Sequence, residues 1–451
     1  MVMIGLEIHL QLLTRSKLFC KCSTNYQQEV NSNICEICTS QPGSKPLAPN
    51  KKAIHQLLKV ALALGTEVLT GKKIPIQRKH YFYPDLPSNY QRTSKPIAVN
   101  GKLGNVRIRE MHIEEDPGRF DIRTGNVEYN RSGVPLVEIV TEPDMNSPEQ
   151  ARAFLESLAM MLDYIEVTKR EEGSMRIDAN VSIEGGNRVE IKNINSFKGV
   201  FTALNYEIVR QKLMREKGLE VQQETRHYDD SQGITIGSRK KETVDDYRYI
   251  PDPDLAPIII TKQMVTEAKK EIPELPEAKA SRLVKEYKID EHDAKIIVAD
   301  KKIAEIFEAL AKRGIEPTLC ARWLNRDLRK QLNYRKLGTN EAQLNITSLE
   351  HILKQLQTKK IHEGIAEQML IDLLDKGTVK LLEKLSDKEK IASIVDEVLR
   401  HNQQAVADYE RGEKKALNYI FGAIMKKTGK AADPKIVMDT LKERLNEKGA
   451  S

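Results

Sequence analysis

The distribution of proline divides this chain into two parts that must fold in different ways. Sixteen of its 18 prolines lie at or before Pro276, and only Pro317 and Pro434 follow. Proline fixes its own φ angle and lacks a backbone N–H donor, so it interrupts long helices. Before Pro276, short apolar or alternating runs such as 134–140 are separated by turn residues and mixed with helical stretches such as 151–164. This part is therefore predicted to have an α+β fold.

Helical periodicity dominates the rest of the chain. Segments 301–312, 349–356 and 391–399 repeat apolar residues at helical spacing, with Lys, Glu and Gln between them. This pattern predicts amphipathic helices. The length of 451 residues exceeds one ordinary domain, so two or three domains are expected.

A strand is expected at residues 4–12, where apolar and polar residues alternate. Neighbouring side chains of a strand point to opposite faces, so the apolar set should face a core while Glu7 and His9 share the other face. Two such groups on one face suit a metal or substrate site. They are equally compatible with solvated residues on an edge strand, and the pattern alone leaves both interpretations open.

Four cysteines follow in the pattern C-x-C, twelve intervening residues, C-x-x-C, namely Cys20, Cys22, Cys35 and Cys38. Four thiolates so spaced can surround one tetrahedral zinc ion, and such a closed site would be structural rather than catalytic. The first pair is tighter than usual, so reduced and uncoordinated thiols remain an alternative. A disulfide framework is less expected, because the chain is long, Cys320 stands alone and nothing like a secretory leader precedes the first strand.

The charge distribution suggests a polyanionic partner at one end. No apolar run approaches the length of a membrane span, so a soluble, cytoplasmic protein without a membrane partner is expected. The net charge is +7, and residues 411–451 hold ten Lys and Arg against five Asp and Glu. Nucleic acid is attracted to such a region, although a basic helical surface is as often only a soluble exterior. Five lysines cluster around one predicted helix there, namely Lys414, Lys415, Lys426, Lys427 and Lys430.

A dense group of acids indicates a cation site. His112 is followed at 114–116 by Glu, Glu and Asp, a further acid stands at Glu138, and Arg176 and Asp178 alternate along one predicted strand. Carboxylates with one imidazole suit Mg²⁺ or Mn²⁺, which hold nucleotide phosphates, and arginine neutralises developing phosphoryl charge. Acid clusters on solvated loops are also common. The sequence has no Walker A loop, no G-x-S-x-G elbow and no G-x-G-x-x-G fingerprint, so neither a covalent nucleophile nor a redox cofactor is indicated.

Long motifs occur in order along the whole chain. Besides the cysteine pairs they are 4–9 (IGLEIH), 81–87 (YFYPDLP), 112–118 (HIEEDPG), 130–144 (NRSGVPLVEIVTEPD), 173–182 (GSMRIDANVS), 190–197 (EIKNINSF) and 246–255 (DYRYIPDPDL). With these motifs the chain closely resembles the B subunits of the glutamine-dependent aspartyl/glutamyl-tRNA amidotransferases. The related archaeal E subunit carries a large inserted domain before its helical part. Here 251–276 leads directly into helices, which favours the B type.

The resemblance implies a ligase subunit that acts on Glu attached to tRNA(Gln), Asp attached to tRNA(Asn), or both. ATP would phosphorylate the side-chain carboxylate. A partner A subunit, an amidase, would release ammonia from glutamine, and the ammonia would pass through an internal channel and displace phosphate to give the amide. A small C subunit usually completes the assembly. The missing nucleophile elbow agrees with this division of labour.

Carried over residue by residue, the resemblance implies Glu7, His9 and Glu115 as Mg²⁺ (or Mn²⁺) ligands, with Asp178 as a further candidate. Some family members lack the cysteines, so zinc is not expected to be essential to the reaction. Loss of Cys35 should then only destabilise the chain.

Two cationic and three aromatic residues complete the expected site. Arg176 and Lys192 are assigned to ATP phosphate or carboxylate charge, and the alternative for both is an internal ion pair with neighbouring acids. Tyr81, Tyr83 and Tyr90 can stack on the terminal adenosine of tRNA, although aromatic residues at alternating spacing more often pack a sheet.

The fold implied by the resemblance has three parts. Residues 1–290 should form a cradle-shaped α+β domain around an antiparallel sheet, with a zinc knuckle at 20–38. An all-α helical domain should span 291–385. A small helical tail at 386–451 should carry the tRNA-binding lysines, which contact phosphates without reading bases.

Two other functions remain open from the residues alone. One is a related ATP-dependent carboxyl-amine ligase that acts on a different carrier. The other is a noncatalytic, zinc-stabilised tRNA-binding protein in which the acid cluster is only structural. Nucleotide turnover that depends on misacylated tRNA separates the enzyme from the binding protein.

Overall fold

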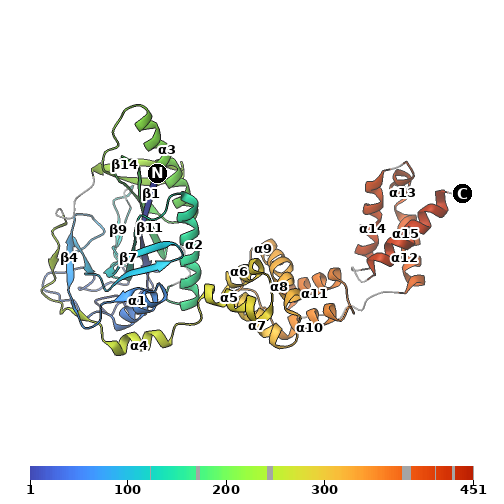
Figure 1. Ribbon diagram of the computed structural model, residues 1–451, viewed down its shortest axis with the longest axis horizontal. Helices are drawn as coiled ribbons and strands as arrows, with labels where there is room; N and C mark the ends of the chain where they lie inside the picture. Colours follow the sequence, from blue (N-terminus) through green and yellow to red (C-terminus); the bar gives the residue numbers. More distant parts are fainter. Residues whose placement is uncertain are drawn as a thin grey trace. The chain divides into compact units, whose positions relative to one another are not determined.

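The structure is a computed structural model that describes residues 1–121, 123–168, 173–240, 247–377, 387–411, 413–428 and 432–449. The chain forms two compact units, Met1–Leu275 and Pro276–Ser451, and the boundary falls where prolines become rare. The first unit combines a large sheet with helices and the second is helical (Figure 1), so the predicted α+β class is confirmed. The finer division at residues 290 and 385 stays a prediction.

A sheet of twelve described strands forms the centre of the first unit. Along the main path of the sheet the strands are β14 (Ile234–Lys240), β13 (Glu224–Asp229), β12 (Val189–Ile194), β11 (Met175–Ile183), β1 (Val2–Gln11), β10 (Pro135–Thr141), β7 (Val106–Glu115), β5 (Tyr90–Ser94), β4 (Ile76–His80) and β15 (Ile250–Pro251), with β6 (Ala98–Leu103) beside β7 and β2 (Glu67–Val68) beside β6. Two further sheets have two strands each, β3 (Lys73–Ile74) with β16 (Ile258–Ile259) and β8 (Arg119–Phe120) with β9 (Val127–Glu128).

The expectation of an antiparallel sheet needs one correction. Among the described strands of the large sheet, β12 and β13 are parallel and the other neighbours are antiparallel. The cause is α3 (Phe197–Glu216), which lies between these two strands in the chain. A helix in the connection returns the chain to the end of the sheet at which β12 began, so β13 runs in the same direction. The sheet is therefore mixed.

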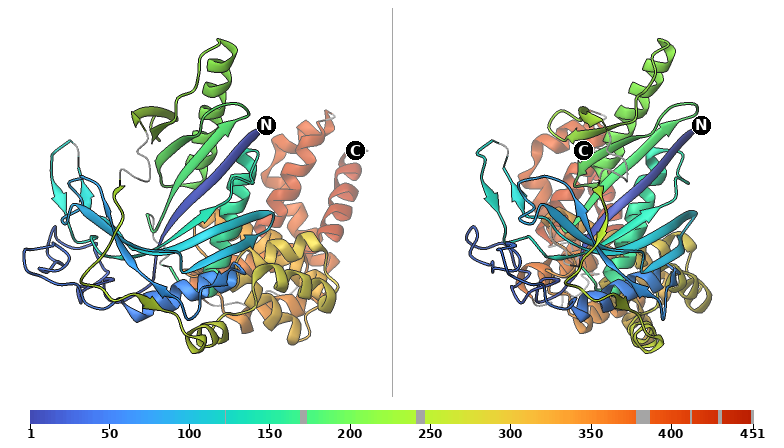
Figure 2. Two further views of the ribbon diagram at one scale, coloured as in Figure 1. Left: turned by 60° about the vertical axis from the view of Figure 1, so that its left-hand side comes forward. Right: turned by 90° about the vertical axis from the view of Figure 1, so that its left-hand side faces the viewer.

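The two faces of the sheet have opposite character. On β1, Ile4, Leu6, Ile8 and Leu10 are all buried, and they join a core that includes residues of α1 (Lys51–Ala63), α2 (Pro148–Ile165) and α3. In Figure 1, α2 and α3 lie on one side of strands β1 and β11. The alternate residues of β1 face the other way, and Figure 2 shows this deep-blue strand between its neighbours. Burial of the apolar face thus fixes which side chains remain for chemistry.

Strand register brings the chemically active residues of three segments together. Glu7 lies opposite Val140 of β10 and Asp178 of β11. His9 lies opposite Glu138 of β10 and Arg176 of β11. Directly opposite side chains on one face of an antiparallel pair lie within contact distance. Strand β1 therefore places Glu7 beside Asp178, and His9 beside Glu138 and Arg176.

Ser147 and Ser196 begin the two long helices of the first unit. Each side chain accepts a hydrogen bond from a backbone N–H in the first turn, of Gln150 in α2 and of Gly199 in α3, which satisfies a donor that the helix itself leaves free. The predicted helix 151–164 is present as α2. Among the described residues of this unit, the remaining α-helix is α4 (Lys262–Lys270).

The second unit contains two hydrophobic cores among its described helices. One core involves α5 (Pro276–Tyr287), α6 (Glu291–Val298), α7 (Lys301–Lys312), α8 (Pro317–Trp323), the π-helix η2 (Leu324–Leu328), α9 (Arg329–Arg335), α10 (Ile346–Gln357) and α11 (Glu363–Lys376). The other involves α12 (Lys388–His401), α13 (Gln403–Glu410), α14 (Lys414–Lys427) and α15 (Pro434–Gly449). Of the helices in the described ranges, none is long and apolar enough to cross a membrane.

Candidate active site and cysteine cluster

A cavity of about 400 Å³ opens on the polar face of the sheet. The strand residues that line it include Glu7 and His9 of β1, Glu114 of β7, Glu138 of β10, Arg176 and Asp178 of β11, and Lys192 of β12. Lys79, Tyr81, Tyr83 and Tyr247 line another part of the wall. A second cavity of about 860 Å³ shares Glu7, Lys79, Glu114, Glu138, Lys192 and Tyr247 with the first. These volumes lie in the range of small-molecule sites.

One group of donors in the cavity suits a hard divalent cation. His9, Glu114 and Glu138 each offer a ligand atom, and these atoms lie within 4.8 Å of one another. The Glu114 Oε1 atom lies 3.4 Å from the His9 Nε2 atom, is buried, and has no hydrogen-bond partner among the described residues. A buried carboxylate oxygen without a donor carries a large desolvation cost. Two carboxylates with one imidazole are a donor set that Mg²⁺ or Mn²⁺ accepts, so these residues fit the expected metal.

The protonation of this group reflects its burial. Burial, together with the nearby charge of Glu138, raises the pKa of Glu114 to about 8. Burial lowers the pKa of His9, so the imidazole is neutral and keeps a lone pair for coordination. A cation bound here would supply the positive charge that stabilises the ionised carboxylates.

A second acidic group lies beside the first and holds an internal cation. Glu7, Asp178 and Glu190 also have ligand atoms within 4.8 Å of one another. The Lys192 Nζ atom donates to Asp178 at 2.7 Å and lies 3.1 Å from Glu190. Although burial opposes it, the charges of Asp178 and Glu190 raise the pKa of Lys192 well above its usual range. Lys192 therefore both lines the cavity and forms the internal ion pair that the alternative interpretation expected.

Arg176 likewise lines the cavity and forms an internal ion pair. Its guanidinium donates to the carboxylate of Asp116, whose side chain is fully buried. The Arg176 side chain keeps 26% of its surface exposed and lines the cavity. The other guanidinium donors thus remain available to an anionic group there.

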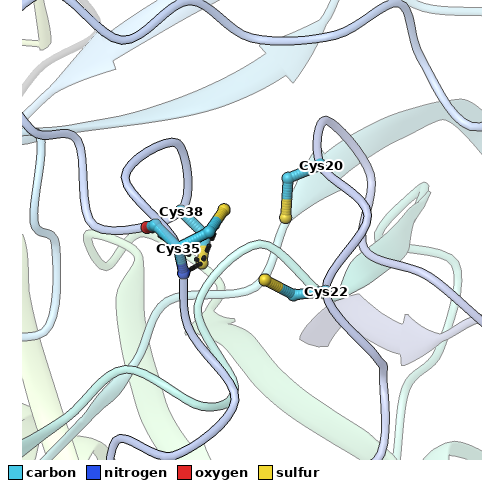
Figure 3. A group of neighbouring side chains, drawn as sticks. All are labelled: Cys20, Cys22, Cys35 and Cys38. Atoms are coloured by element: carbon cyan, nitrogen blue, oxygen red, sulfur yellow. Dashed lines mark hydrogen bonds between the residues drawn. The ribbon is translucent and has the colours of Figure 1, made fainter.

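The four cysteines gather at one place, as Figure 3 shows for the two pairs. Their sulfur atoms lie within 4.8 Å of one another, and the described cysteines are all free of disulfides. A hydrogen bond from the Cys20 thiol, supported by the nearby Lys17 ammonium, lowers the pKa of Cys38 to about 5. The Lys17 Nζ atom lies 3.4 Å from the Cys38 Sγ atom. Four sulfurs at this separation fit a tetrahedral zinc ion.

Comparison with known proteins decides the family. A family model described as the GatB/GatE catalytic domain matches residues 2–266, and a model described as the GatB domain matches residues 305–445. The B subunit of the aspartyl/glutamyl-tRNA(Asn/Gln) amidotransferase of Methanocaldococcus jannaschii is 46% identical over 462 residues, covering 98% of each chain. That of Methanopyrus kandleri is 46% identical over 459 residues, covering 99% of each. That of Methanothermobacter thermautotrophicus is 44% identical over 449 residues, covering 98% of this chain and 99% of its own.

The chain belongs to the GatB family of amidotransferase B subunits. The predicted resemblance is confirmed over almost the whole length. The match to a catalytic domain also confirms the prediction of an enzyme subunit.

Not every residue carried over from the GatB resemblance lies in the cavity. The carboxylate of Glu115 lies 3.3 Å from Arg92 instead of joining the His9 group, because neighbouring residues of β7 point to opposite faces. Glu114 is the residue of this acidic run whose carboxylate lies with His9 and Glu138, and the role of Glu115 as a metal ligand stays a prediction. Tyr81 and Tyr83 line the cavity, whereas the ring of Tyr90 lies under the guanidinium of Arg92, 5.2 Å from the centroid.

Three further wall residues were not singled out from the sequence. Glu138 is an acid within the apolar run of β10, a pattern that does not by itself indicate a ligand. Lys79 comes from a segment without a motif, and Tyr247 belongs to the motif at 246–255, which does not by itself indicate a place in the cavity wall. The Lys79 Nζ atom lies 4.8 Å from the centre of the Tyr247 ring, a contact that only the fold reveals.

Of the five lysines predicted to bind tRNA, four fall within α14. Lys415 and Lys426 are exposed, and Lys427 forms an ion pair with Glu397 of α12. The side chain of Lys414 and all of Lys430 lie outside the described residues. Two described lysines of α14 thus present their charge to solvent, and their role toward tRNA is a proposal.

Proposed function

We propose that this chain is the transamidase subunit that activates the side-chain carboxylate of Glu-tRNA(Gln), Asp-tRNA(Asn) or both with ATP, and then converts it into the amide. The observation that carries the proposal is the cavity in which His9, Glu114 and Glu138 lie beside Arg176 and Lys192. This cavity lies within the segment that matches the GatB/GatE catalytic domain. Relatives that match the chain end to end bear the name of the B subunit.

The residues of the cavity suit phosphoryl transfer to a carboxylate. Both reactants are anionic, so positive groups must offset their repulsion and hold them in line. Arg176, Lys79 and Lys192 supply fixed positive charge in the cavity wall. His9, Glu114 and Glu138 would hold Mg²⁺ or Mn²⁺, and such an ion would supply positive charge that offsets the negative charge of the phosphates.

The described residues that line the first cavity include no serine or cysteine nucleophile, so in this proposal a partner supplies the ammonia. The sequence lacks the nucleophile elbow of a hydrolase. An amidase A subunit, ammonia transfer through an internal channel and a small C subunit are therefore parts of the proposal. The cysteine cluster would hold a structural zinc ion, and the basic tail would bind tRNA phosphates.

The first experiment supplies the purified chain with ATP, Mg²⁺, ammonium salt and either Glu-tRNA(Gln) or Asp-tRNA(Asn), and quantifies the amide formed on each tRNA. Free ammonium replaces the glutaminase. We expect ATP-dependent amide formation on at least one tRNA. The same assay with the A and C subunits present shows whether activity requires assembly, and absence of amide there would refute the proposal.

Glu7→Gln provides the matched variant. Glu7 lines both cavities and accepts a hydrogen bond from Asn180 at 3.0 Å, so the substitution removes charge with little change of shape. We expect it to abolish amide formation and leave tRNA binding intact. Normal turnover would remove Glu7 from the site. A noncatalytic tRNA-binding protein would bind tRNA without ATP turnover in either form.

A further inference from the structure

A continuous chain of hydrogen bonds joins Tyr26, which lies in the loop that carries the cysteines, to Arg176. Tyr26 lies between the two cysteine pairs in the sequence and is 4% exposed. Its hydroxyl donates to the Gln11 Oε1 atom at 3.0 Å. The Gln11 Nε2 atom donates to the Asp116 Oδ2 atom at 2.6 Å, and the Asp116 Oδ1 atom accepts from Arg176. Three hydrogen bonds thus link Tyr26 of the cysteine loop, through Gln11 and Asp116, to the guanidinium of Arg176 in the cavity.

The members of this chain have little freedom to reorient. Gln11 is 4% exposed and Asp116 is 1% exposed, so a lost partner is not replaced by bulk water. The tyrosine hydroxyl donates to the amide oxygen of Gln11 and thereby turns the amide N–H toward Asp116. Arg131 adds a second cation 3.6 Å from the Asp116 carboxylate. Buried networks of this kind are rigid when every member is satisfied.

A second connection runs through the backbone. Asp116 pairs with the segment at Gly133, whose N–H donates to the Asp116 carbonyl at 2.9 Å. The Gly133 carbonyl accepts from the backbone N–H of Leu18 at 2.8 Å. The neighbouring Ser132 hydroxyl donates to the Cys38 carbonyl at 3.2 Å. A displacement of the cysteine loop therefore acts on Asp116 from its side chain and from its backbone.

We infer that the cysteine cluster positions Arg176 in the cavity, acting through Tyr26, Gln11 and Asp116. These three are positioning residues, since they do not line the cavity themselves. The inference rests on the proposed function for the role of Arg176. It deepens that function by assigning the cysteine loop to the positioning of the Arg176 guanidinium. A zinc ion bound to the four sulfurs would hold in place the loop that carries Tyr26. Tyr26 would then orient Gln11 and Asp116, as residues behind a functional side chain commonly do.

The first test reads the environment of Arg176 without using the reaction. Phenylglyoxal modifies arginine side chains, and peptide mass spectrometry gives the rate at each position. Tyr26→Phe, and separately removal of the metal with a chelator, should each raise the modification rate of Arg176 several-fold. Arg107 is the internal reference, because its partner is Asp144 at 2.6 Å and it has no part in the chain. Its rate should stay constant.

Tyr228→Phe is the matched control variant. It removes a hydroxyl that interacts with Thr202 and Asp230, away from Gln11 and Asp116, and should leave the rate at Arg176 unchanged. The inference is overturned if neither Tyr26→Phe nor metal removal changes that rate. It is overturned as well if Tyr228→Phe raises the rate equally, since the effect would then report general loosening.

The second test uses amide formation by the assembly with the A and C subunits. Tyr26→Phe should lower kcat by about tenfold at unchanged KM for the aminoacyl-tRNA. In the Arg176→Gln background the same substitution should have no further effect, because residues that act through one another are not additive. Equal losses in both backgrounds would overturn the inference. If the wild-type assembly forms no amide, the proposed function fails while the modification test still stands.

Discussion

Three consecutive acids of this chain have three different environments. Glu114 lies in the cavity, Glu115 contacts Arg92, and Asp116 contacts Arg176. Alternation along a strand predicts that the first and third share a side and the second does not. Which side faces the cavity depends on the pairing of β7 with β10, and that register is a long-range property of the sheet. The sequence therefore predicts an acidic site here but does not select its ligand.

Two substitutions separate Glu114 from Glu115. Glu114→Gln should reduce Mg²⁺-dependent amide formation by at least about 10- to 100-fold, because it removes a charge from the group with His9 and Glu138. Glu115→Gln should retain most of the activity and lower the free energy of unfolding by about 1–3 kcal/mol, because Arg92 loses a charged partner. Initial rates across a Mg²⁺ series and urea unfolding measure the two effects. Inactive but fully stable Glu115→Gln would instead place Glu115 at the metal, as the family resemblance implies.

Thiol reactivity distinguishes the clustered cysteines from Cys320. Cys320 is fully buried, and burial raises its pKa to about 12, so its reactive thiolate is scarce at neutral pH. The chain should contain about one zinc ion and react slowly with a chromogenic disulfide reagent. After chelation four thiols should react, and the fifth only in urea. Rapid reaction of the four before chelation, with no zinc detected, would support uncoordinated thiols.

At the scale of elements, most strands and helices follow from periodicity, and α3 shows why some do not. The buried face of α3 includes Glu207 and Gln211, both fully buried. These polar residues interrupt the apolar stripe that identifies a helix in sequence. Glu207 is balanced by Arg210 at 2.7 Å and Arg226 at 3.4 Å, which come from the helix itself and from β13. The partners that make this burial possible are brought together only by the fold.

Glu207→Ala tests this account of α3. The substitution leaves Arg210 and Arg226 without their buried partner, and should lower the free energy of unfolding by about 3–5 kcal/mol. Urea unfolding followed by circular dichroism measures the change. Glu216→Ala, at an exposed position of the same helix, serves as the control and should stay within about 0.5 kcal/mol of wild type. Equal effects of the two would show that helix propensity, not the buried ion pairs, governs this element.

At the scale of the whole molecule, the loss of prolines after Pro276 anticipates the boundary between the two compact units. The reason is physical, because a chain that builds helices must exclude proline from their interiors. Composition also anticipates the basic surface of α14 but not its pairing. Lys427 is partly neutralised by Glu397, a contact between helices that are adjacent only in the folded chain.

The salt dependence of tRNA binding tests the surface of α14. Replacing Lys415 and Lys426 by Gln should weaken binding at low salt and reduce the slope of log affinity against log salt by roughly two, if each contacts one phosphate. Filter binding across a salt series gives the slope. The control pair Lys269→Gln and Lys270→Gln removes the same charge from exposed positions of α4. An identical slope in both double variants would remove α14 from the tRNA contact.

Lys192 also bears on whether the chain needs a bound cation in order to fold. Its ammonium lies between Asp178 and Glu190, at 2.7 Å and 3.1 Å, where the bare carboxylates would otherwise repel one another in a low-dielectric interior. This ammonium already offsets part of the negative charge on the polar face of the sheet. We therefore expect the first unit to fold without a divalent cation, so that a cation bound at the proposed site would affect the activity of the folded chain rather than its formation.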